Sequence, residues 1–295
     1  MINIHARKKI EEMLAEDMGY GDLTTEVLLP PDVTIAAKIV AKQGGILAGT
    51  VEAATAFEIM GARAESLKSE GDLITSGEIV MRVEGPARSI LTAERTVLNL
   101  LMRMSGVATA TREMVDRARK VKPNIIIAAT RKVVPLFAYF DKRAVKLGGG
   151  DTHRFRLDDC VLIKDNHIKL VGGIAGALRR AKKAGFSKKI EIEVNKAKDA
   201  IEAAKAGADI IMFDNMAPDE IKHAVKLLDE LRLRDKVLLE ASGEINPENV
   251  AEYAASGVDI ISSSYMTFRA PALDMSLEID KDFKLGARGK RRKPR

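Results

Sequence analysis

The chain has 295 residues, of which 46% are hydrophobic and 31% are charged, the balance of a folded protein of about two domains and not of a disordered one. Its net charge of +6 comes from residues 281–295, which hold eight Lys or Arg and one Asp, so we expect a solvated basic tail and no nucleic-acid partner. The single cysteine, Cys160, excludes an internal disulfide. The sequence has no apolar run near the ~18 residues of a membrane helix and no apolar core of a signal peptide, so we expect a cytoplasmic protein with no membrane partner.

Residues 1–110 are expected to form a smaller α+β domain. Residues 4–16 have helical spacing, and a second, short helix is predicted at EAATAFEIMG. The segment GDLITSGEIVMRVEGPARSIL alternates apolar residues between glycines, which is typical of short antiparallel strands. Two helical stretches, AERTVLNLLMRMSG and VATATREMVDRARKV, are predicted to lead into the rest of the chain.

From about residue 124 onward, short β-branched or apolar runs alternate with helical segments rich in Ala, Lys and Glu. Pro218 and Pro247 stand where a first helical turn begins, and Gly207 and Gly257 stand just past helix ends. Such alternation predicts βαβ units and a parallel sheet. The expected strands are residues 125–130, 160–164, 190–194, 209–213, 237–241 and 258–263.

Each of these expected strands ends in, or carries, polar and ionisable residues. The carboxyl ends of the strands of a βα barrel share one face, where the active site lies, whereas an open doubly wound sheet places its site at one switch point and uses fewer strands. We therefore predict an α/β fold with a βα barrel of about six strands. The residues concerned are Arg131 and Lys132, Lys164, Glu191 and Glu193, Asp214 and Asn215, Glu240 with Ser242 and Gly243, and Ser262 to Ser264.

The stretch GGGDTHRFRLDDCVLIKDNH places two of the four histidines and several cations beside three glycines. Taken singly, these residues have ordinary explanations: the glycines make a turn, His153 is a half-buried histidine, and Lys164 forms a structural ion pair with Glu193 or Asp214. Together they indicate a site for a polyanion and a divalent metal. The cations that the barrel would gather are Arg131, Lys132, His153, Arg154 and Lys164.

Several linked motifs carry a resemblance to a known family. The runs ATRKVVP, DKRAVKLGGGDTHRFRLDDCVLIKDNHI, IEIEV, MFDNM, LEASGEI and GVDIISSS resemble, in order and spacing, the quinolinate phosphoribosyltransferases, also called carboxylating nicotinate-nucleotide pyrophosphorylases. EDMGYGDLTTE, AERTVLNLLMRMSGVAT and PALDMSLEI extend the resemblance over nearly the whole chain.

The resemblance implies an activity and an architecture. The family converts quinolinate and phosphoribosyl pyrophosphate to nicotinate mononucleotide, pyrophosphate and carbon dioxide, with Mg²⁺, in NAD synthesis. It implies an N-terminal α/β sandwich domain (residues 1–110), an incomplete barrel (111–268), and a C-terminal segment (269–295) that returns to the first domain and ends in the basic tail. It also implies a homodimer or higher homo-oligomer.

The resemblance further implies a role for each site residue. Arg131, Lys132, His153 and Arg154 would line the quinolinate pocket, with Arg95 lent by the partner subunit. Lys164, Glu193 and Asp214 would surround the ribose and pyrophosphate, with both carboxylates meeting Mg²⁺ directly or through water. Ser242, Gly243, Ser263 and Ser264 would hold the 5′-phosphate. The residues assigned to catalysis are Lys132, Lys164, Glu193 and Asp214.

The sequence departs from the family pattern in two places. Val133, Val134 and residues 136–138 replace a Thr and a Gly-Leu-Arg, and Ser264-Tyr265-Met266 replaces a Gly-Ala-Leu turn. At the first, Lys142 and Arg143 are candidates to supply the missing cationic contacts.

Two other functions are compatible with the residues alone. A Schiff-base lyase would use Lys164 as nucleophile at a barrel strand end. The other is a non-catalytic or transport-associated relative with the same fold, or a binding protein that uses the basic tail on nucleic acid.

Overall fold

The computed structural model describes residues 2–280, so the expected basic tail at 281–295 lies outside the described residues. The described residues divide into two compact units, residues 2–106 with 272–280 and residues 107–271. Within the described range, no helix is both long and apolar enough to cross a membrane.

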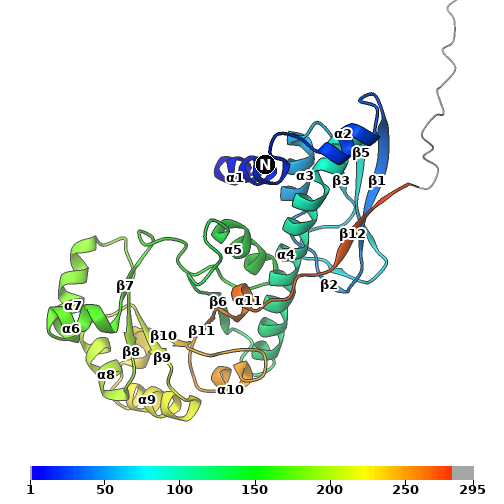
Figure 1. Ribbon diagram of the computed structural model, residues 1–295. Coiled ribbons are helices and arrows are strands. Elements are labelled where there is room, and N and C mark those ends of the chain that lie inside the picture. Colours follow the sequence, from blue (N-terminus) through cyan, green and yellow to red (C-terminus); the bar gives the residue numbers. More distant parts are fainter. Residues whose placement is uncertain (1, 281–295) are drawn as a thin grey trace, which may run out of the picture. The chain divides into compact units, whose positions relative to one another are not determined.

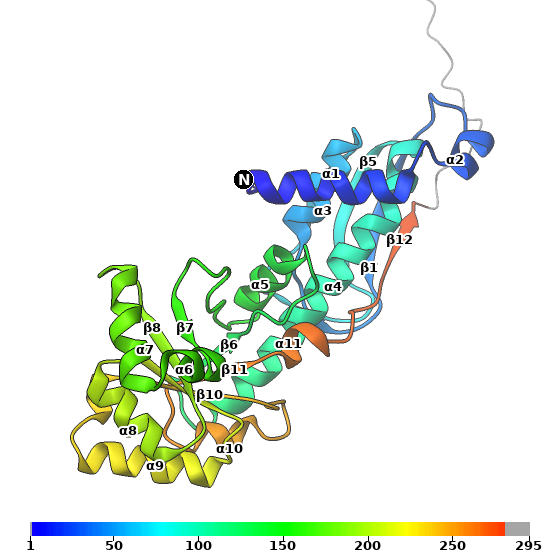
Figure 2. The same ribbon diagram turned by 60° about the vertical axis from the view of Figure 1, so that its left-hand side comes forward.

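The first unit is built on a four-stranded antiparallel sheet in the order β12-β1-β5-β3, and α1 packs against α3 (Figure 2). β1 alternates exposed and buried residues along its first half, as a strand with one face on a core does. The Asn3 and Asp22 side chains accept backbone N–H groups at the starts of α1 and α2. The strands are β1 (Thr34–Ala41), β2 (Gly45–Ile46), β3 (Arg63–Ser66), β4 (Leu73–Ile74), β5 (Ile79–Pro86) and β12 (Met275–Ile279), and the helices are α1 (Ile4–Met18), α2 (Leu23–Leu28) and α3 (Thr50–Ile59).

The two helical stretches predicted after residue 92 form one helix, α4 (Ala87–Arg119). The sequence interpretation split it at Gly106, but glycine inside a helix costs only about 1 kcal/mol relative to alanine. The Gly106 position is buried, and the apolar neighbours Leu101, Met104 and Val107 are fully buried. Packing of this face therefore keeps the helix continuous.

The second unit holds a six-stranded, all-parallel sheet, as predicted, with helices placed along it (Figure 1). α7, α8 and α9 contact one another in sequence order, and α7 and α8 contact β7 and β8. The strands are β6 (Ile126–Ala129), β7 (Val161–Ile163), β8 (Ile190–Val194), β9 (Ile210–Asp214), β10 (Leu238–Ser242) and β11 (Ile260–Ser263). The helices are α5 (Ala138–Leu147), α6 (Asp165–Val171), α7 (Ile174–Ala181), α8 (Ala197–Ala206), α9 (Pro218–Glu230), α10 (Val250–Ala254) and α11 (Tyr265–Phe268), with short 3₁₀ turns at η1 (Lys182–Ala184) and η2 (Arg234–Lys236).

The strand order shows an incomplete barrel. In the order β6-β11-β10-β9-β8-β7, the first strand of the unit along the chain, β6, pairs with the last, β11. The sheet therefore curls round, and within the described residues it lacks only a pairing between β6 and β7. At β6 that place is taken by the segment after the three glycines, where Asp151 forms a parallel bridge to Ala128.

The glycines of this segment allow close packing. A Cβ atom on Gly148 would lie 2.5 Å from the Ala108 carbonyl oxygen, and one on Gly150 would lie 2.8 Å from Thr111 Cγ2 and 3.0 Å from the Ile127 carbonyl oxygen. These distances leave no room for a side chain. The segment can therefore lie against α4 and β6, and it delivers the residues that follow to the carboxyl ends of the strands.

Candidate active site

A cavity of about 410 Å³ lies at the carboxyl ends of the barrel strands. Eight residues predicted for the site line it, and all six strands, β6 to β11, contain or lead into residues of its wall. The lining residues are Ala129, Thr130, Arg131, Lys132, His153, Arg154, Leu162, Lys164, Glu193, Met212, Asp214, Asn215, Glu240, Ser242 and Ser262.

The register of the parallel strands places the carboxylates. Glu193 on β8 pairs with Met212 on β9, and Asp214, at the end of β9, pairs with Ser242 on β10. Alternation along a strand then puts Glu191 and Glu193 on the same side of the sheet.

Lys164 and Glu193 form an ion pair in the cavity wall, where the lysine Nζ donates to Glu193 Oε1. Lys164 also precedes α6, and its backbone N–H donates to His167 Nδ1 at 2.9 Å, which ties the strand end to the helix start. Lys164 thus forms the structural ion pair that was its ordinary explanation, and both side chains of the pair also line the cavity.

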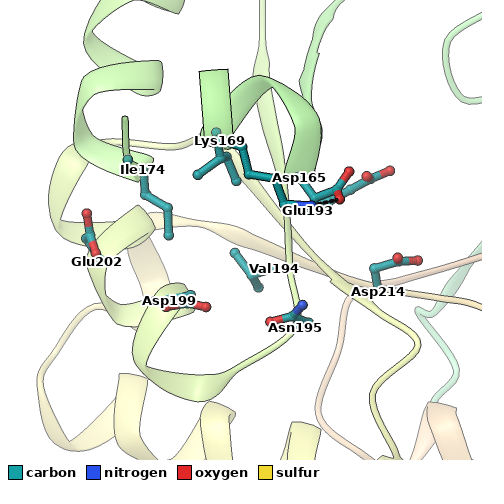
Figure 3. Close-up of a pocket in the computed structure, with 11 residues that line it drawn as sticks. Asp165, Lys169, Ile174, Glu193, Val194, Asn195, Asp199, Glu202 and Asp214 are labelled. Carbon is teal, nitrogen blue, oxygen red and sulfur yellow. Dashed lines mark hydrogen bonds and ion pairs between the residues drawn. The ribbon is translucent and has the colours of Figure 1, made fainter. Parts of the chain in front are cut away.

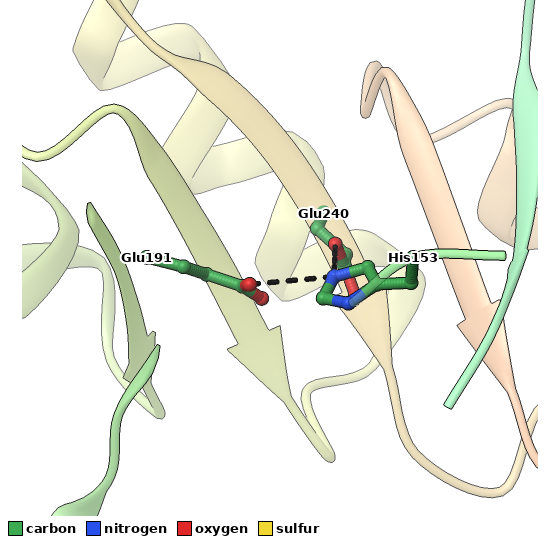
Figure 4. A group of neighbouring side chains, drawn as sticks. All are labelled: His153, Glu191 and Glu240. Atoms are coloured by element: carbon green, nitrogen blue, oxygen red, sulfur yellow. Dashed lines mark hydrogen bonds and ion pairs between the residues drawn. The ribbon is translucent and has the colours of Figure 1, made fainter. Parts of the chain in front are cut away.

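His153 is held by two carboxylates from different strands (Figure 4). Its Nε2 lies 3.3 Å from Glu191 Oε2 and 3.2 Å from Glu240 Oε2, and both glutamate side chains are completely buried. Burial alone would lower the pKa of His153, but the hydrogen bonds and charges of Glu191 and Glu240 outweigh it and raise the pKa to about 10. The imidazole is therefore a cation at neutral pH.

Burial also raises the pKa of Glu191, against the opposing effect of His153. The sequence interpretation noticed Glu191 and Glu240 but gave them no role. A role for Glu191 could have been predicted from the alternation Ile-Glu-Ile-Glu-Val, which places Glu191 on the same side of β8 as Glu193, inside the barrel. The His153, Glu191 and Glu240 ligand atoms lie within 4.8 Å of one another, a spacing compatible with a metal ion. Glu240 is hydrogen-bonded to the His153 ring, whereas Glu191 meets the ring as an ion pair and its buried oxygens have no hydrogen-bond partner among the described residues.

Glu193 and Asp214 also face a second cavity of about 340 Å³ (Figure 3). This cavity adds the carboxylates of Asp165, Asp199 and Glu202. Mg²⁺ prefers oxygen ligands and is commonly bound by one or two carboxylates together with substrate phosphates and water. Glu193 and Asp214, which line both cavities, are carboxylates of the kind that such an ion uses.

Four predicted residues lie outside the cavity lining. Arg95 is on α4 in the first unit, and Gly243, Ser263 and Ser264 do not line the wall. The Ser263 hydroxyl donates to the Ile245 carbonyl at 2.6 Å and accepts the Tyr265 N–H, so it shapes the loop.

Ser262 takes the wall position instead, with a buried hydroxyl that lacks a hydrogen-bond partner among the described residues. The three consecutive serines gave no signal to distinguish it from its neighbours.

Lys142 does not supply a cationic contact to the altered loop. Its side chain is fully buried, and its Nζ donates to the backbone carbonyls of Thr152 and Arg154. The altered loop itself contains Leu136, which adopts a left-handed conformation (φ 66°) and is exposed.

Comparison with known proteins agrees with this geometry. The family model for the quinolinate phosphoribosyl transferase C-terminal domain matches residues 107–278, and the model for the N-terminal domain matches residues 22–105. A probable carboxylating nicotinate-nucleotide pyrophosphorylase of Methanothermobacter thermautotrophicus is 48% identical over 92% of this chain and 97% of its own length. One from Archaeoglobus fulgidus is 49% identical over 89% of this chain and 99% of its own.

A solved structure gives the same picture at the level of the fold. The nicotinate-nucleotide pyrophosphorylase from Francisella tularensis superposes with a TM-score of 0.88, at 35% identity, over 95% of this chain and 98% of that one. Because both family models and relatives of this similarity span most of the sequence, the chain belongs to the quinolinate phosphoribosyl transferase family.

Proposed function

We propose that this protein is a carboxylating nicotinate-nucleotide pyrophosphorylase, which transfers the phosphoribosyl group of phosphoribosyl pyrophosphate to quinolinate and releases pyrophosphate and carbon dioxide in de novo NAD synthesis. The observation that carries the proposal is the cavity itself. It gathers five cationic side chains and the carboxylates of Glu193 and Asp214 at the strand ends of a barrel in this family.

The cations suit a flat dicarboxylate. Arg131, Lys132, His153 and Arg154 come from two loops, and all line the cavity. Guanidinium groups bind carboxylates through paired hydrogen bonds, and the imidazolium of His153 adds a fixed charge. These four residues are proposed to bind quinolinate.

The other half of the cavity suits the phosphorylated sugar. Lys164, Glu193 and Asp214 all line the cavity, and we assign Lys164 to the pyrophosphate and the two carboxylates to ribose hydroxyls. Glu193 and Asp214 would also hold Mg²⁺, directly or through water, and the bound metal would neutralise charge on the pyrophosphate leaving group. Ser242 and Ser262 line the cavity. We assign them to the 5′-phosphate, together with Gly243, Ser263 and Ser264.

The reaction follows from the charges. The quinolinate ring nitrogen attacks the anomeric carbon as the bond to pyrophosphate breaks, and the oxocarbenium-like sugar is stabilised by a nearby carboxylate. Lys164 and Lys132 stabilise the departing negative charge. The carboxylate next to the new pyridinium nitrogen then leaves as carbon dioxide. The electron pair of the broken bond stays on the ring carbon, where the adjacent positive nitrogen stabilises it, and this carbon takes a proton from water to give nicotinate mononucleotide. Positioning of the reactants can contribute about 7–11 kcal/mol to such a reaction.

The assembly is part of the proposal. Arg95 lies outside the second unit, and we assign it to the quinolinate pocket of a partner subunit in a homodimer.

The surroundings of Lys164 do not favour a Schiff-base mechanism. Its side chain is 47% exposed and is paired with Glu193, whereas a Schiff-base lysine is activated by desolvation or by neighbouring cations.

The proposal is tested by turnover of quinolinate with phosphoribosyl pyrophosphate and Mg²⁺ by the wild-type protein and by Arg131→Ala and Lys164→Ala. We expect formation of nicotinate mononucleotide by the wild type, with a loss of roughly a hundredfold or more in kcat/KM in each variant. Borohydride should trap no keto substrate on Lys164. A folded wild-type protein that fails to turn over quinolinate would contradict the proposal.

A further inference from the structure

A buried lysine lies beneath the turn that carries His153 and Arg154. Lys142, on α5, is 0% exposed, and its Nζ donates to the Thr152 and Arg154 carbonyl oxygens, each at 2.5 Å. These carbonyls lie on either side of His153 in the sequence. Lys142 itself is not part of the cavity wall, so it touches the site only through the backbone of the turn.

The ammonium group depends on this turn for its hydrogen bonds. Among the salt bridges of residues 2–280 there is none to Lys142, and its Nζ also lies 5.2 Å from the centroid of the Phe155 ring. An ammonium has three donors, and burying it without partners is costly. The two carbonyls are the hydrogen-bond acceptors of its ammonium group, so displacing the turn would take both acceptors away from a buried cation.

Charge at Lys142 persists at neutral pH. Burial lowers its pKa to about 8, against the opposing charges of Asp159 and Asp151, while Arg131 and Arg154 lower it further.

The turn itself requires support. His153 has φ 49°, a left-handed conformation that a residue with a side chain adopts only when its surroundings hold it. Its N–H donates to Asp151 Oδ1 at 2.7 Å, which fixes the residue from the N-terminal side. Lys142 binds the carbonyls before and after it. The backbone that aims the imidazole and the Arg154 guanidinium is thus restrained on both sides.

We propose that Lys142 is a positioning residue for quinolinate binding, which fixes the His153–Arg154 turn from below through two backbone carbonyls. This inference rests on the proposed function. The lysines near the site then have two different roles. Lys132 and Lys164 face the cavity, and Lys142 holds the turn that forms part of the cavity wall.

Lys142→Met tests the proposal, because methionine fills a similar volume and removes every donor. We expect the KM for quinolinate to rise about tenfold or more, since small misplacements of binding groups are costly, while the KM for phosphoribosyl pyrophosphate stays within about twofold. Lys142→Gln keeps an amide donor and should be intermediate. Lys146→Met, an exposed position on the same helix, is the matched control and should behave as wild type.

The outcomes are distinguishable. Wild-type turnover of quinolinate, measured first, tests the proposed function separately from the role of Lys142. Thermal unfolding and near-ultraviolet circular dichroism show whether the Lys142→Met protein is folded. If it is, an unchanged KM for quinolinate, or an equal rise of both KM values, overturns the inference. Where the Met variant does not fold, the Gln variant decides in the same way: a selective rise in the KM for quinolinate supports the role, and an unchanged value overturns it.

Discussion

At the scale of single residues, the main feature of the site is an imidazolium fixed by two buried carboxylates. Glu191 on β8 and Glu240 on β10 face the His153 ring, and their charges keep it protonated. A group whose pKa is raised on folding contributes stability that is fully present below its ordinary value of 6.5 and is lost as the pH rises through about 10. Across the neutral range, the cation that faces a dicarboxylate is therefore retained, while its contribution to stability begins to decline above pH 6.5.

Glu240→Gln should make quinolinate binding sensitive to pH. With one carboxylate removed, the pKa of His153 falls toward neutrality, because burial continues to lower it. We expect kcat/KM for quinolinate to be nearly flat between pH 6.5 and 8.5 in the wild type, and to fall about tenfold over that range in the variant. Parallel pH profiles of the two proteins would show that Glu240 does not hold the imidazolium.

Asp214→Asn should weaken the use of Mg²⁺. Removing a carboxylate charge at the junction of the two cavities should raise the Mg²⁺ concentration for half-maximal activity several-fold and lower kcat by roughly a hundredfold. Asp199→Asn, which lines only the second cavity, is the control. A Mg²⁺ titration in which both variants behave alike would remove Asp214 from the metal site.

At the scale of elements, the close packing of Gly148 to Gly150 determines where the His153–Arg154 turn lies. A Cβ on Gly150 would meet Thr111, Val145 and Ile127 at 3.0 Å or less. We expect Gly150→Ala to destabilise the protein by about 1–3 kcal/mol and to raise the KM for quinolinate.

Gly176→Ala is the matched control for Gly150→Ala. It lies inside α7, where the nearest atom to a new Cβ is 3.6 Å away, so alanine should be neutral or slightly stabilising. Thermal unfolding of both variants checks the pair, and equal stabilities would show that the segment is not closely packed.

The elements also show how far the sequence could predict this fold. All six barrel strands were predicted within one or two residues at each end, because each combines an apolar run with a polar end and a helical segment follows. The continuity of α4 through Gly106 was not predictable, since tertiary packing overrides a local breaker. Nor was the bridge between Asp151 and Ala128, which depends on closure of the barrel.

The same limit applies to the site. Charged residues that follow a strand, such as Arg131 and Lys164, were found because strand ends of a barrel converge. Ser262 and not Ser263 lines the cavity because the Ser263 hydroxyl is hydrogen-bonded to the Ile245 carbonyl. Lys142 is buried because its ammonium group is hydrogen-bonded to the backbone of the His153–Arg154 turn. Neither has a counterpart in local sequence pattern.

At the scale of the whole molecule, the proposed lending of Arg95 between subunits predicts complementation. Arg95→Ala and Lys164→Ala should each be nearly inactive alone. In a mixed dimer, one site would carry both substitutions and the other neither, so random re-association of equal amounts should restore about a quarter of wild-type activity. Mixed dimers that form without any recovery would show that Arg95 acts in its own subunit or not at all.

The central claim is that this cavity joins phosphoribosyl transfer to loss of a carboxylate. The most direct test supplies phosphoribosyl pyrophosphate, Mg²⁺ and quinolinate labelled at the carboxylate next to the ring nitrogen. Nicotinate mononucleotide and labelled carbon dioxide are measured together, and a parallel reaction contains nicotinate in place of quinolinate. The account predicts equal amounts of both products from quinolinate and no nucleotide from nicotinate. Nucleotide formed from nicotinate, or carbon dioxide released without nucleotide, would contradict it.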